Sequence, residues 1–566
     1  MKKYSIGLDF GTNSCRSLIV DLSDGTELAS NVFSYPSGSD GILIDPKEPN
    51  LARQNPQDYI EGIKETITKA IKIAKKEFTE FKRENIIGIG VDTTGSSPMP
   101  VTSDCASLSS LPEFKNDLNA MVWLWKDHTG HAEAAKITEL AGKIRPQYLK
   151  KIGGIYSSEW FWSKILHCYN TDPDVFKATE SFVEICDWIP AVLTGKTEPD
   201  KIKRSICAAG HKAMYNEDWG GLPDKEFLTS LSPALAELRD KLYEKTFTSD
   251  RLAGVLSNEW ADVLGLVPGI AIAVGAFDAH MGAVGAGINP GTLVKILGTS
   301  TCDIMTSPNN KNLSDIPGVC GIVDGSVIPE YFGIEAGQSA VGDIFLWFVK
   351  NLVPEEYGKT VDEKFKNLSN EAEKQKPGEH GLLALDWNNG NRTILVDVRL
   401  SGLLLGQTLH TKPHEIYRAL IEATAFGALT IINRIEEYGV PVKEIVNCGG
   451  LAVKNPFLMQ IYADITGRPM KVSRSEQTPA LGAAIFGAIA AGKEVSGFSD
   501  IQEAQKAITG IKKTYEPDTS NHSVYKKLYA LYKQLHDAFG TEKWSGKMHN
   551  VMKDLLIIRD EQRKKK

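Results

Sequence analysis

The sequence is poor in cysteine, and none of its cysteines are closely paired. Eight occur in 566 residues, at Cys15, Cys105, Cys168, Cys186, Cys207, Cys302, Cys320 and Cys448. Because no two are separated by only two residues, the sequence indicates neither a zinc ribbon nor a thioredoxin-type redox pair. Scattered cysteines in a chain of this length are typical of a reduced, cytosolic protein and not of a disulfide framework.

Long apolar runs are also missing. No segment approaches the roughly 18–20 uncharged apolar residues that span a bilayer. The first residues reach Asp9 and Arg16 without the apolar core of a signal peptide. We therefore expect a cytoplasmic protein that makes no membrane contact.

A strong excess of one charge is lacking as well. The chain carries 64 basic and 71 acidic residues, a formal net charge of −7. This balance argues against a nucleic-acid partner, which normally meets a basic face. It does not exclude an anionic small ligand, because backbone amides and a few side chains suffice to bind one. With 42% hydrophobic residues, the composition is that of a globular protein of two large domains or several smaller ones.

Several common catalytic motifs do not occur. The absence of GxxxxGK[ST] and of a helix-opening GxGxxG argues against a P-loop and against a dinucleotide site. No HExxH pair and no GxSxG elbow are present either. A nucleotide site in this chain would therefore have to be built differently.

What is present is an alternation of strand and helix patterns. Residues 6–14 form a short apolar strand entering a turn, and residues 17–21 predict the returning strand. Asn55 and Pro56 are typical of a helix start, and the buried strand pattern of residues 86–92 follows that helix. This order favours an α/β layer.

The opening pattern recurs in the second half of the chain. A strand at 270–274 leads to Asp278, and a strand at 293–297, a turn at 298–301 and a return strand at 302–305 follow. Helix patterns at 414–436, 456–466 and 480–491 flank a strand at 442–446. The echo predicts two lobes, each beginning with a hairpin of a size to hold phosphate.

The turn after the first strand has the components of a phosphate cradle. Gly11 lets the backbone approach a ligand, while Thr12, Asn13 and Ser14 add short donors, and successive turn amides can bind an anion without lysine. Asp9 beside this turn could hold Mg²⁺ through its water shell. The alternative is an ordinary hairpin whose glycine and asparagine only satisfy turn geometry.

Three later features favour the cradle. Gly298 and Thr299 repeat the hairpin turn, and Asp278 follows a strand, where strand ends meet a crevice. The glycine pair Gly449 and Gly450 leaves room for a flat base or a ribose. Each could be structural alone, but their order along the chain is hard to explain as coincidence.

Residues 4 to about 495 resemble the FGGY carbohydrate kinases, which share the actin, hexokinase and heat-shock ATPase fold. The most diagnostic segment is Gly402 to Gly406 followed by residues 415–422, with Gln407 departing from the usual aliphatic residue. Residues 156–166 fit a second family region loosely. Within the family, residues 90–98, 209–212 and 335–343 resemble the bacterial L-ribulokinases, and the motifs of xylulokinases and glycerol kinases are missing at 93–98.

The resemblance implies a two-lobed α/β fold of the actin/hexokinase-like (ribonuclease H-like) type with an interlobe cleft. The expected parts are an N-terminal sugar-binding lobe over 1–287, a C-terminal nucleotide-binding lobe over 288–545 and a charged tail over 546–566. The implied reaction is transfer of phosphate from Mg-ATP to O5 of L-ribulose, a step of L-arabinose catabolism. The resemblance leaves a homodimer open.

The resemblance also assigns roles to individual residues. Asp278 becomes the general base, and Asp9 orients Mg²⁺. The expected nucleotide contacts are Thr12, Asn13, Ser14, Arg16, Thr299, Gly342, Gly449, Gly450 and Asn455. The expected sugar contacts are Gly95, Ser96, Trp125, Lys212, Asp278 and Glu335. For Arg16 a salt bridge at the hairpin edge is the alternative, and for Trp125 a place in the core.

Other functions remain open at this point. The acceptor could be another ketopentose or a pentitol, such as D-ribulose or ribitol. A more distant alternative is an ATP-driven binding protein on the same fold, whose ATP turnover would not depend on sugar. A sugar sensor without turnover is a third, although both Asp9 and Asp278 are present.

Overall fold

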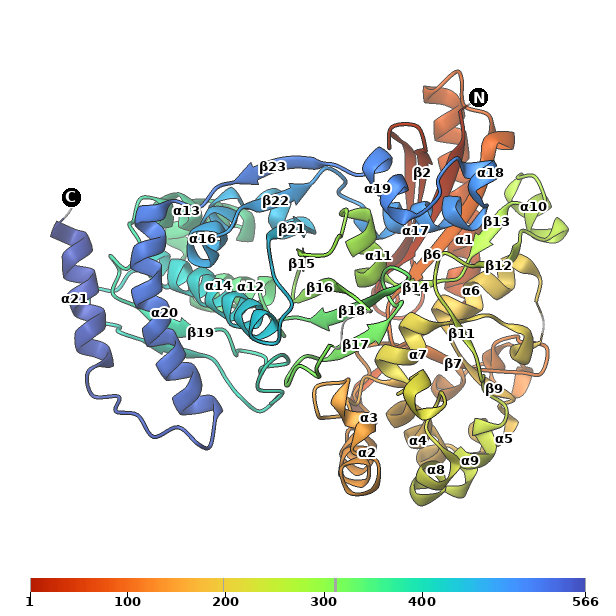
Figure 1. The fold of residues 1–566 in the computed structure, drawn as a ribbon, viewed down its shortest axis with the longest axis horizontal. Coiled ribbons are helices and arrows are strands. Elements are labelled where there is room, and N and C mark those ends of the chain that lie inside the picture. Colours follow the sequence, from red (N-terminus) through yellow and green to blue (C-terminus); the bar gives the residue numbers. More distant parts are fainter. Residues whose placement is uncertain (1, 197, 310–312, 565–566) are drawn as a thin grey trace.

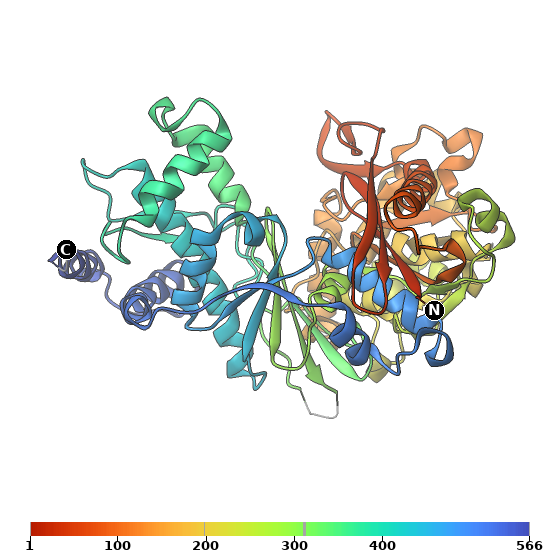
Figure 2. The same cartoon turned by 90° about the horizontal axis from the view of Figure 1, so that it is seen from above.

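The computed structural model describes residues 2–196, 198–309 and 313–564. It consists of two α/β lobes, each built on a seven-stranded sheet. Figures 1 and 2 show the first lobe, mainly red to yellow-green, beside the second, mainly green to blue, with the blue segment 478–508 lying at the first lobe. The predicted two-lobed architecture is therefore confirmed.

The first sheet has the order β12-β13-β6-β1-β2-β3, and β14 also pairs with β6. Its strands are β1 (Tyr4–Phe10), β2 (Ser14–Asp21), β3 (Glu27–Ser34), β6 (Ile86–Thr93), β12 (Leu252–Val255), β13 (Ala271–Ala273) and β14 (Ala276–Phe277). The helices of this lobe are α1 (Pro56–Glu77), α2 (His131–Ile144), α3 (Gln147–Lys150), α4 (Phe161–Thr171), α5 (Pro173–Ala178), α6 (Ile185–Thr194), α7 (Ile206–Lys212), α8 (Lys225–Leu231), α9 (Pro233–Arg239), α10 (Asn258–Leu264) and α11 (Asp278–Gly285). Smaller strands are β4 (Leu43–Asp45), β5 (Glu48–Gln54), β7 (Pro98–Val101), β8 (Val122–Trp123), β9 (Ser181–Glu184), β10 (Arg204–Ser205) and β11 (Thr246–Phe247).

The second sheet has the order β17-β18-β16-β15-β21-β22-β23. Its strands are β15 (Thr292–Leu297), β16 (Thr301–Pro308), β17 (Gly321–Asp324), β18 (Tyr331–Ala336), β21 (Glu444–Cys448), β22 (Met470–Ser473) and β23 (Ile511–Tyr515), and a separate pair is formed by β19 (Leu383–Leu385) and β20 (Leu403–Leu405). The helices from here on are α12 (Gly342–Leu352), α13 (Val361–Glu373), α14 (Pro413–Glu437), α15 (Gly450–Lys454), α16 (Pro456–Thr466), α17 (Thr478–Ala490), α18 (Lys493–Ser496), α19 (Ile501–Ile508), α20 (Thr519–Gly540) and α21 (Val551–Lys564).

Local sequence explains the elements that open each lobe. The Asn55 side chain accepts a hydrogen bond from the Gln57 amide, and Pro56 begins α1 as expected. Both predicted hairpins form: Phe10 pairs with Cys15 across β1 and β2, and Leu297 pairs with Thr301 across β15 and β16. The predicted echo between the two lobes is therefore a structural repeat.

Helices α11 and α17 lie between the two sheets, and each contacts the sheet formed by the other half of the chain. Helix α17, from the second half of the chain, packs on β1 and β6, whereas α11 contacts β15 and β16. A Cβ atom on Gly7 or Gly90 would lie 1.7 or 1.8 Å from a backbone oxygen of α17. Glycine therefore allows the helix backbone to touch the strand backbone. Residues from both sheets and both helices share one apolar core.

Among the described residues, no single helix is long and apolar enough to cross a membrane, and one bent pair, Thr478–Ala490 with Lys493–Ile508, meets the criteria of length and composition together.

The C-terminal segment differs from the expected charged tail. Residues 551–564 form α21, and its Val551, Leu555 and Ile558 are buried in the core of the second lobe. The Arg563 guanidinium donates to the Glu379 carbonyl at 3.1 Å. Apolar residues at helical spacing decide the conformation of this segment. The predicted tail residues 565–566 lie outside the described residues.

Because the backbones of α17 and β6 touch, one added methyl group at this contact should lower the stability of the protein. Gly90→Ala should lower the free energy of unfolding by about 1–3 kcal/mol, because the added Cβ meets the Ala483 carbonyl and the backbones must separate. Gly142→Ala is the matched control. Gly142 is exposed on α2, a Cβ there would meet only Leu149 Cδ1 at 4.0 Å, and the change should raise stability by about 0.5–1 kcal/mol. Urea unfolding followed by circular dichroism measures both. Unchanged stability of Gly90→Ala would contradict the packing.

Candidate active site

Three carboxylates gather at the edge of the first sheet where its parallel strands end. Asp9 on β1 pairs directly with Asp92 on β6, and Asp92 pairs with Ala276 on β14. Asp278 follows two residues later as the first residue of α11. Asp9 and Asp92 are buried, and the Asp278 side chain is partly accessible.

Burial in this cluster disfavours negative charge. It raises the pKa of Asp278 to about 7, with the Asp9 charge adding to the shift, although the Ala279 amide donates to Asp278 Oδ1 at 2.6 Å. Burial and the two neighbouring carboxylates raise the pKa of Asp92 well above its ordinary value. Burial also raises the pKa of Asp9, and the Arg16 Nε 3.2 Å away opposes this. The salt bridge expected as the alternative role of Arg16 is therefore present, and its partner is Asp9.

Hydrogen bonds to other parts of the first lobe hold the first hairpin turn in place. The Gly11 amide donates to the Ser14 carbonyl at 2.9 Å, which tightens the turn. The Trp125 indole donates to Thr12 Oγ1 at 3.0 Å, so Trp125 lies at this turn. The Asn13 amide donates to the Asp40 carbonyl at 2.7 Å. The predicted cradle residues are therefore adjacent, and Trp125 joins them.

The second hairpin turn is bound to a helix start and to the glycine pair. The Thr299 carbonyl accepts from the Val341 amide at 2.8 Å, and the Gly298 carbonyl accepts from the Gly342 amide at 3.1 Å. Gly449 has φ +89°, and a Cβ there would lie 2.5 Å from the Leu297 carbonyl oxygen, so only glycine fits. Asn455 caps α16 by accepting from the Leu458 amide at 3.0 Å.

An ion pair joins the two lobes. Lys212, at the end of α7, places its Nζ 2.9 and 3.1 Å from the two carboxylate oxygens of Glu335 on β18. Burial favours a higher pKa for Glu335, but Lys212, His211 and His280 together hold the pKa well below its ordinary value. The Tyr156 hydroxyl donates to the Lys212 carbonyl at 2.6 Å. The Lys212 Nζ lies 5.9 Å from the centroid of the Phe277 ring, which directly precedes Asp278.

A buried network positions the loop of Gly95 and Ser96. Glu184 accepts from the Ser96 hydroxyl and, at 2.6 Å, from the Ser97 amide. The Lys164 ammonium donates to the Ser96 carbonyl at 2.7 Å. A Cβ on Gly95 would lie 1.9 Å from the Phe277 ring, which directly precedes Asp278. The loop therefore contacts the element that carries Asp278.

The sequence patterns missed six residues of this region. Asp92 ends a buried strand as Asp9 does, and that parallel could have indicated it. His211 and His280 lie within the segments already noted around Lys212 and Asp278. Lys164 lies within residues 156–166, which fit a family region loosely, and for Glu184 the sequence offers no comparable signal. Arg392, the sixth, donates to the Thr301 carbonyl at 2.7 Å.

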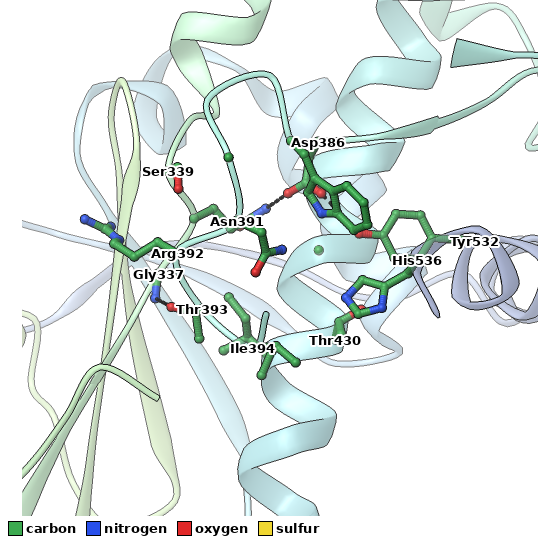
Figure 3. A pocket seen from close by; sticks show the side chains of 15 residues that line it. Gly337, Ser339, Asp386, Asn391, Arg392, Thr393, Ile394, Thr430, Tyr532 and His536 are labelled. Atoms are coloured by element: carbon green, nitrogen blue, oxygen red, sulfur yellow. Dashed lines mark hydrogen bonds between the residues drawn. The ribbon is translucent and has the colours of Figure 1, made fainter. Parts of the chain in front are cut away.

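A small cavity lies in the second lobe beside Gln338 and Asp386 (Figure 3). Its volume is about 10 Å³, which is room for one water molecule. Gln338 donates to Asp386 at 2.7 Å on its wall, and the Arg392 side chain points away from it. The cavity is too small for a nucleotide or a sugar.

Comparisons with known proteins agree with this arrangement. The N-terminal domain of the FGGY family of carbohydrate kinases matches residues 4–285, and the C-terminal domain of that family matches residues 293–491. Proteins named ribulokinase are similar along nearly the whole chain. The one from Vibrio parahaemolyticus is 42% identical over 552 residues, 94% of this chain and 95% of that protein. The one from Anoxybacillus flavithermus is 43% identical over 551 residues, 95% of each.

Solved structures share the fold. A xylulose kinase from Rhodospirillum rubrum superposes with a TM-score of 0.75 at 21% identity, covering 95% of this chain and all of that one. A glycerol kinase from Plasmodium falciparum gives 0.74 at 16% identity, covering 94% and 98%. The chain therefore belongs to the FGGY family of carbohydrate kinases, and it is a sugar kinase with the family's actin-like ATPase fold.

Proposed function

We propose that this kinase transfers the terminal phosphate of ATP to O5 of L-ribulose. The observation that carries the proposal is the place of Asp278, a carboxylate with a near-neutral pKa between the phosphate hairpin and the Lys212–Glu335 ion pair. The similarity to proteins named ribulokinase supports the acceptor. The role proposed for each side chain comes from the family resemblance, and the geometry is compatible with it.

Asp278 serves as the general base. As the O5–phosphorus bond forms and the bond to the leaving ADP breaks, the proton of the O5 hydroxyl passes to the Asp278 carboxylate. A pKa near 7 lets this carboxylate be ionised at neutral pH and still accept a proton effectively. The proton then leaves to solvent when the sugar phosphate departs.

The two hairpins and the glycine turn hold the nucleotide. Turn amides suit phosphate oxygens because they offer donors without a desolvated lysine. The β- and γ-phosphates contact Thr12, Asn13, Ser14, Arg16 and Thr299, and the adenosine borders Gly342, Gly449, Gly450 and Asn455. Open space around Gly450 fits this role, since no atom lies within 4 Å of a Cβ built there.

The carboxylate cluster fits a magnesium ion. Mg²⁺ prefers hard oxygen ligands and keeps several waters. Asp9 lies at the hairpin, and both oxygens of the adjacent Asp92 are buried without a hydrogen-bond partner among the described residues. Asp9 would hold the ion through water. When bound, Mg²⁺ neutralises phosphate charge.

Sugar orientation comes from the ion pair and the loop beside it. Lys212 and Glu335 bind the ketose oxygens, and hydrogen bonds to charged groups contribute about 1.5–3 kcal/mol each. Gly95 and Ser96 shape the pocket wall, and Trp125 lies between the sugar and Thr12. The nucleotide therefore meets the second lobe, over 288–545, and the sugar mainly the first, over 1–287.

A substrate panel tests the function directly. With Mg-ATP, purified protein should release ADP fastest with L-ribulose, and kcat/KM for D-ribulose and ribitol should be lower. NMR of the product should place the phosphate on O5. A higher kcat/KM for another sugar or pentitol would show that this compound, and not L-ribulose, is the preferred acceptor. ADP release that does not depend on sugar would indicate an ATP-driven binding protein instead.

The pKa of Asp278 predicts the acid limb of the pH profile. Because the base must be deprotonated, kcat/KM should be full above pH 7 and fall about tenfold per pH unit below it. Asp278→Asn should lower kcat by about 10²–10⁴. Burial also raises the pKa of Glu184 to about 7, so this residue needs a control. Glu184→Gln should still show the fall of kcat/KM below pH 7. A limb that disappears in Glu184→Gln would remove the assignment to Asp278.

The contact between Gly95 and Phe277 predicts a steric effect on catalysis. Gly95→Ala should lower kcat at least tenfold, because the new methyl group pushes the Phe277 ring and moves Asp278 with it. Phe277→Val makes room, so the double variant should recover most of the loss. Steady-state kinetics of the three variants form a double-mutant cycle. Additive losses would show that the two side chains do not act through each other.

A further inference from the structure

Two buried histidines lie behind the ion pair that joins the lobes. His211 precedes Lys212 on α7, and His280 lies two residues after Asp278 on α11. Both side chains are almost fully buried, and their Nε2 atoms are 3.0 Å apart. His211 Nδ1 is 3.5 Å from Glu335 Oε2, and His280 Nε2 is 3.8 Å from the same oxygen. None of the roles assigned above uses this pair.

The surroundings keep both rings neutral. Burial lowers the pKa of His280 to about 4 and that of His211 well below its ordinary value. A neutral imidazole carries one N–H, so only one Nε2 of the pair can donate to the other. The ionised Glu335 can only accept. A hydrogen on His280 Nε2 faces His211, and one on His211 Nδ1 faces Glu335 Oε2 at 3.5 Å, which is a polar contact and not a hydrogen bond.

The backbone leaves space for this orientation. Gly321 on β17 pairs directly with Glu335 on β18. A Cβ on Gly321 would lie 2.1 Å from His211 Nδ1, so a side chain there would displace the ring. The Ser326 hydroxyl lies 3.0 Å from His211 Nε2 and donates to the Val323 carbonyl at 3.1 Å. The His211 ring is therefore fixed from both lobes.

We propose that His280 and His211 form a relay that positions Glu335 relative to Asp278. A hydrogen bond joins the two rings, and a polar contact of 3.5 Å joins His211 Nδ1 to Glu335. The relay starts on the helix that begins with the base and ends on the carboxylate that orients the sugar. It thereby sets the distance between the sugar hydroxyl and the base. The inference rests on the proposed function for the identity of the sugar, but the relay itself is a property of the free protein.

A cation site is the competing interpretation of the same groups. His211, His280 and Glu335 offer three ligand atoms within 4.8 Å of one another. However, the Lys212 ammonium lies within 3.1 Å of both Glu335 oxygens. A cation would have to displace this positive charge, so the relay is the better account. Metal analysis of the purified protein distinguishes the two.

The experiment compares two substitutions of His280. His280→Gln keeps an N–H donor near the position of Nε2, whereas His280→Leu removes it. We expect His280→Leu to raise KM for L-ribulose about tenfold or more and KM for ATP less than twofold, because one hydrogen bond to the sugar-orienting network is lost. His280→Gln should recover most of the sugar affinity. His549→Leu, on an exposed and distant residue, should behave as the wild type.

A second measurement does not depend on activity. Nitrogen NMR of ¹⁵N-histidine-labelled protein should show both rings neutral at pH 7, each with one protonated and one bare nitrogen. The resonances are assigned by their loss in His280→Gln and in His211→Asn. An imidazolium in either ring at pH 7 would overturn the relay. So would an unchanged KM for L-ribulose in His280→Leu, or stoichiometric zinc in the wild type that His280→Gln loses.

Failure of the relay and failure of the function have different signatures. If the wild-type protein phosphorylates no pentulose, the proposed acceptor is wrong, while the nitrogen spectra still decide the relay. If the wild type is active on L-ribulose and His280→Leu keeps its KM, only the relay is wrong.

Discussion

The structure depends on the contact of two small-residue helices with each other and with the sheets on either side. Helices α11 and α17 lie so close that a Cβ on Gly482 would be 1.8 Å from the Met281 carbonyl oxygen. The same helix α17 touches β1 and β6 through Gly7, Gly88 and Gly90. Interiors packed this tightly deform little. The position of α11, and with it Asp278 at its first residue, is therefore fixed relative to the strands that carry Asp9 and Asp92.

This constraint explains why three acidic side chains are held together. Like charges in a buried cluster repel, and each carboxylate loses hydration there. Such an arrangement persists only where the surrounding packing determines it or where a ligand offsets the charge. In this kinase the packing comes from backbone contacts at glycine, which are insensitive to side-chain rearrangement. The raised pKa of Asp278 is then a consequence of where the backbone places it.

The sequence contained the repeated elements but not the partners that support them. The two hairpins, the cap at Asn55 and the strand before Asp278 follow from local patterns, because each involves residues near one another in the chain. Glu184, Lys164 and the contact of His211 with His280 join distant segments, which a single sequence does not reveal. Helix α21 differs from the expected tail for another reason. Its terminal charges favour a solvated tail, but its apolar residues four and three positions apart form a buried helix face.

The ion pair of Lys212 and Glu335 joins the two lobes at the proposed sugar site. Each lobe supplies one partner, and both lie in surroundings that disfavour a lone charge. Moving the lobes apart would leave a buried lysine and a buried glutamate without compensation, and breaking such a pair is strongly unfavourable. The charged groups proposed to recognise the sugar are consequently assembled only when the two sheets face each other. Because α11 belongs to that same interface, the proposed base and the proposed sugar-orienting groups come into place together.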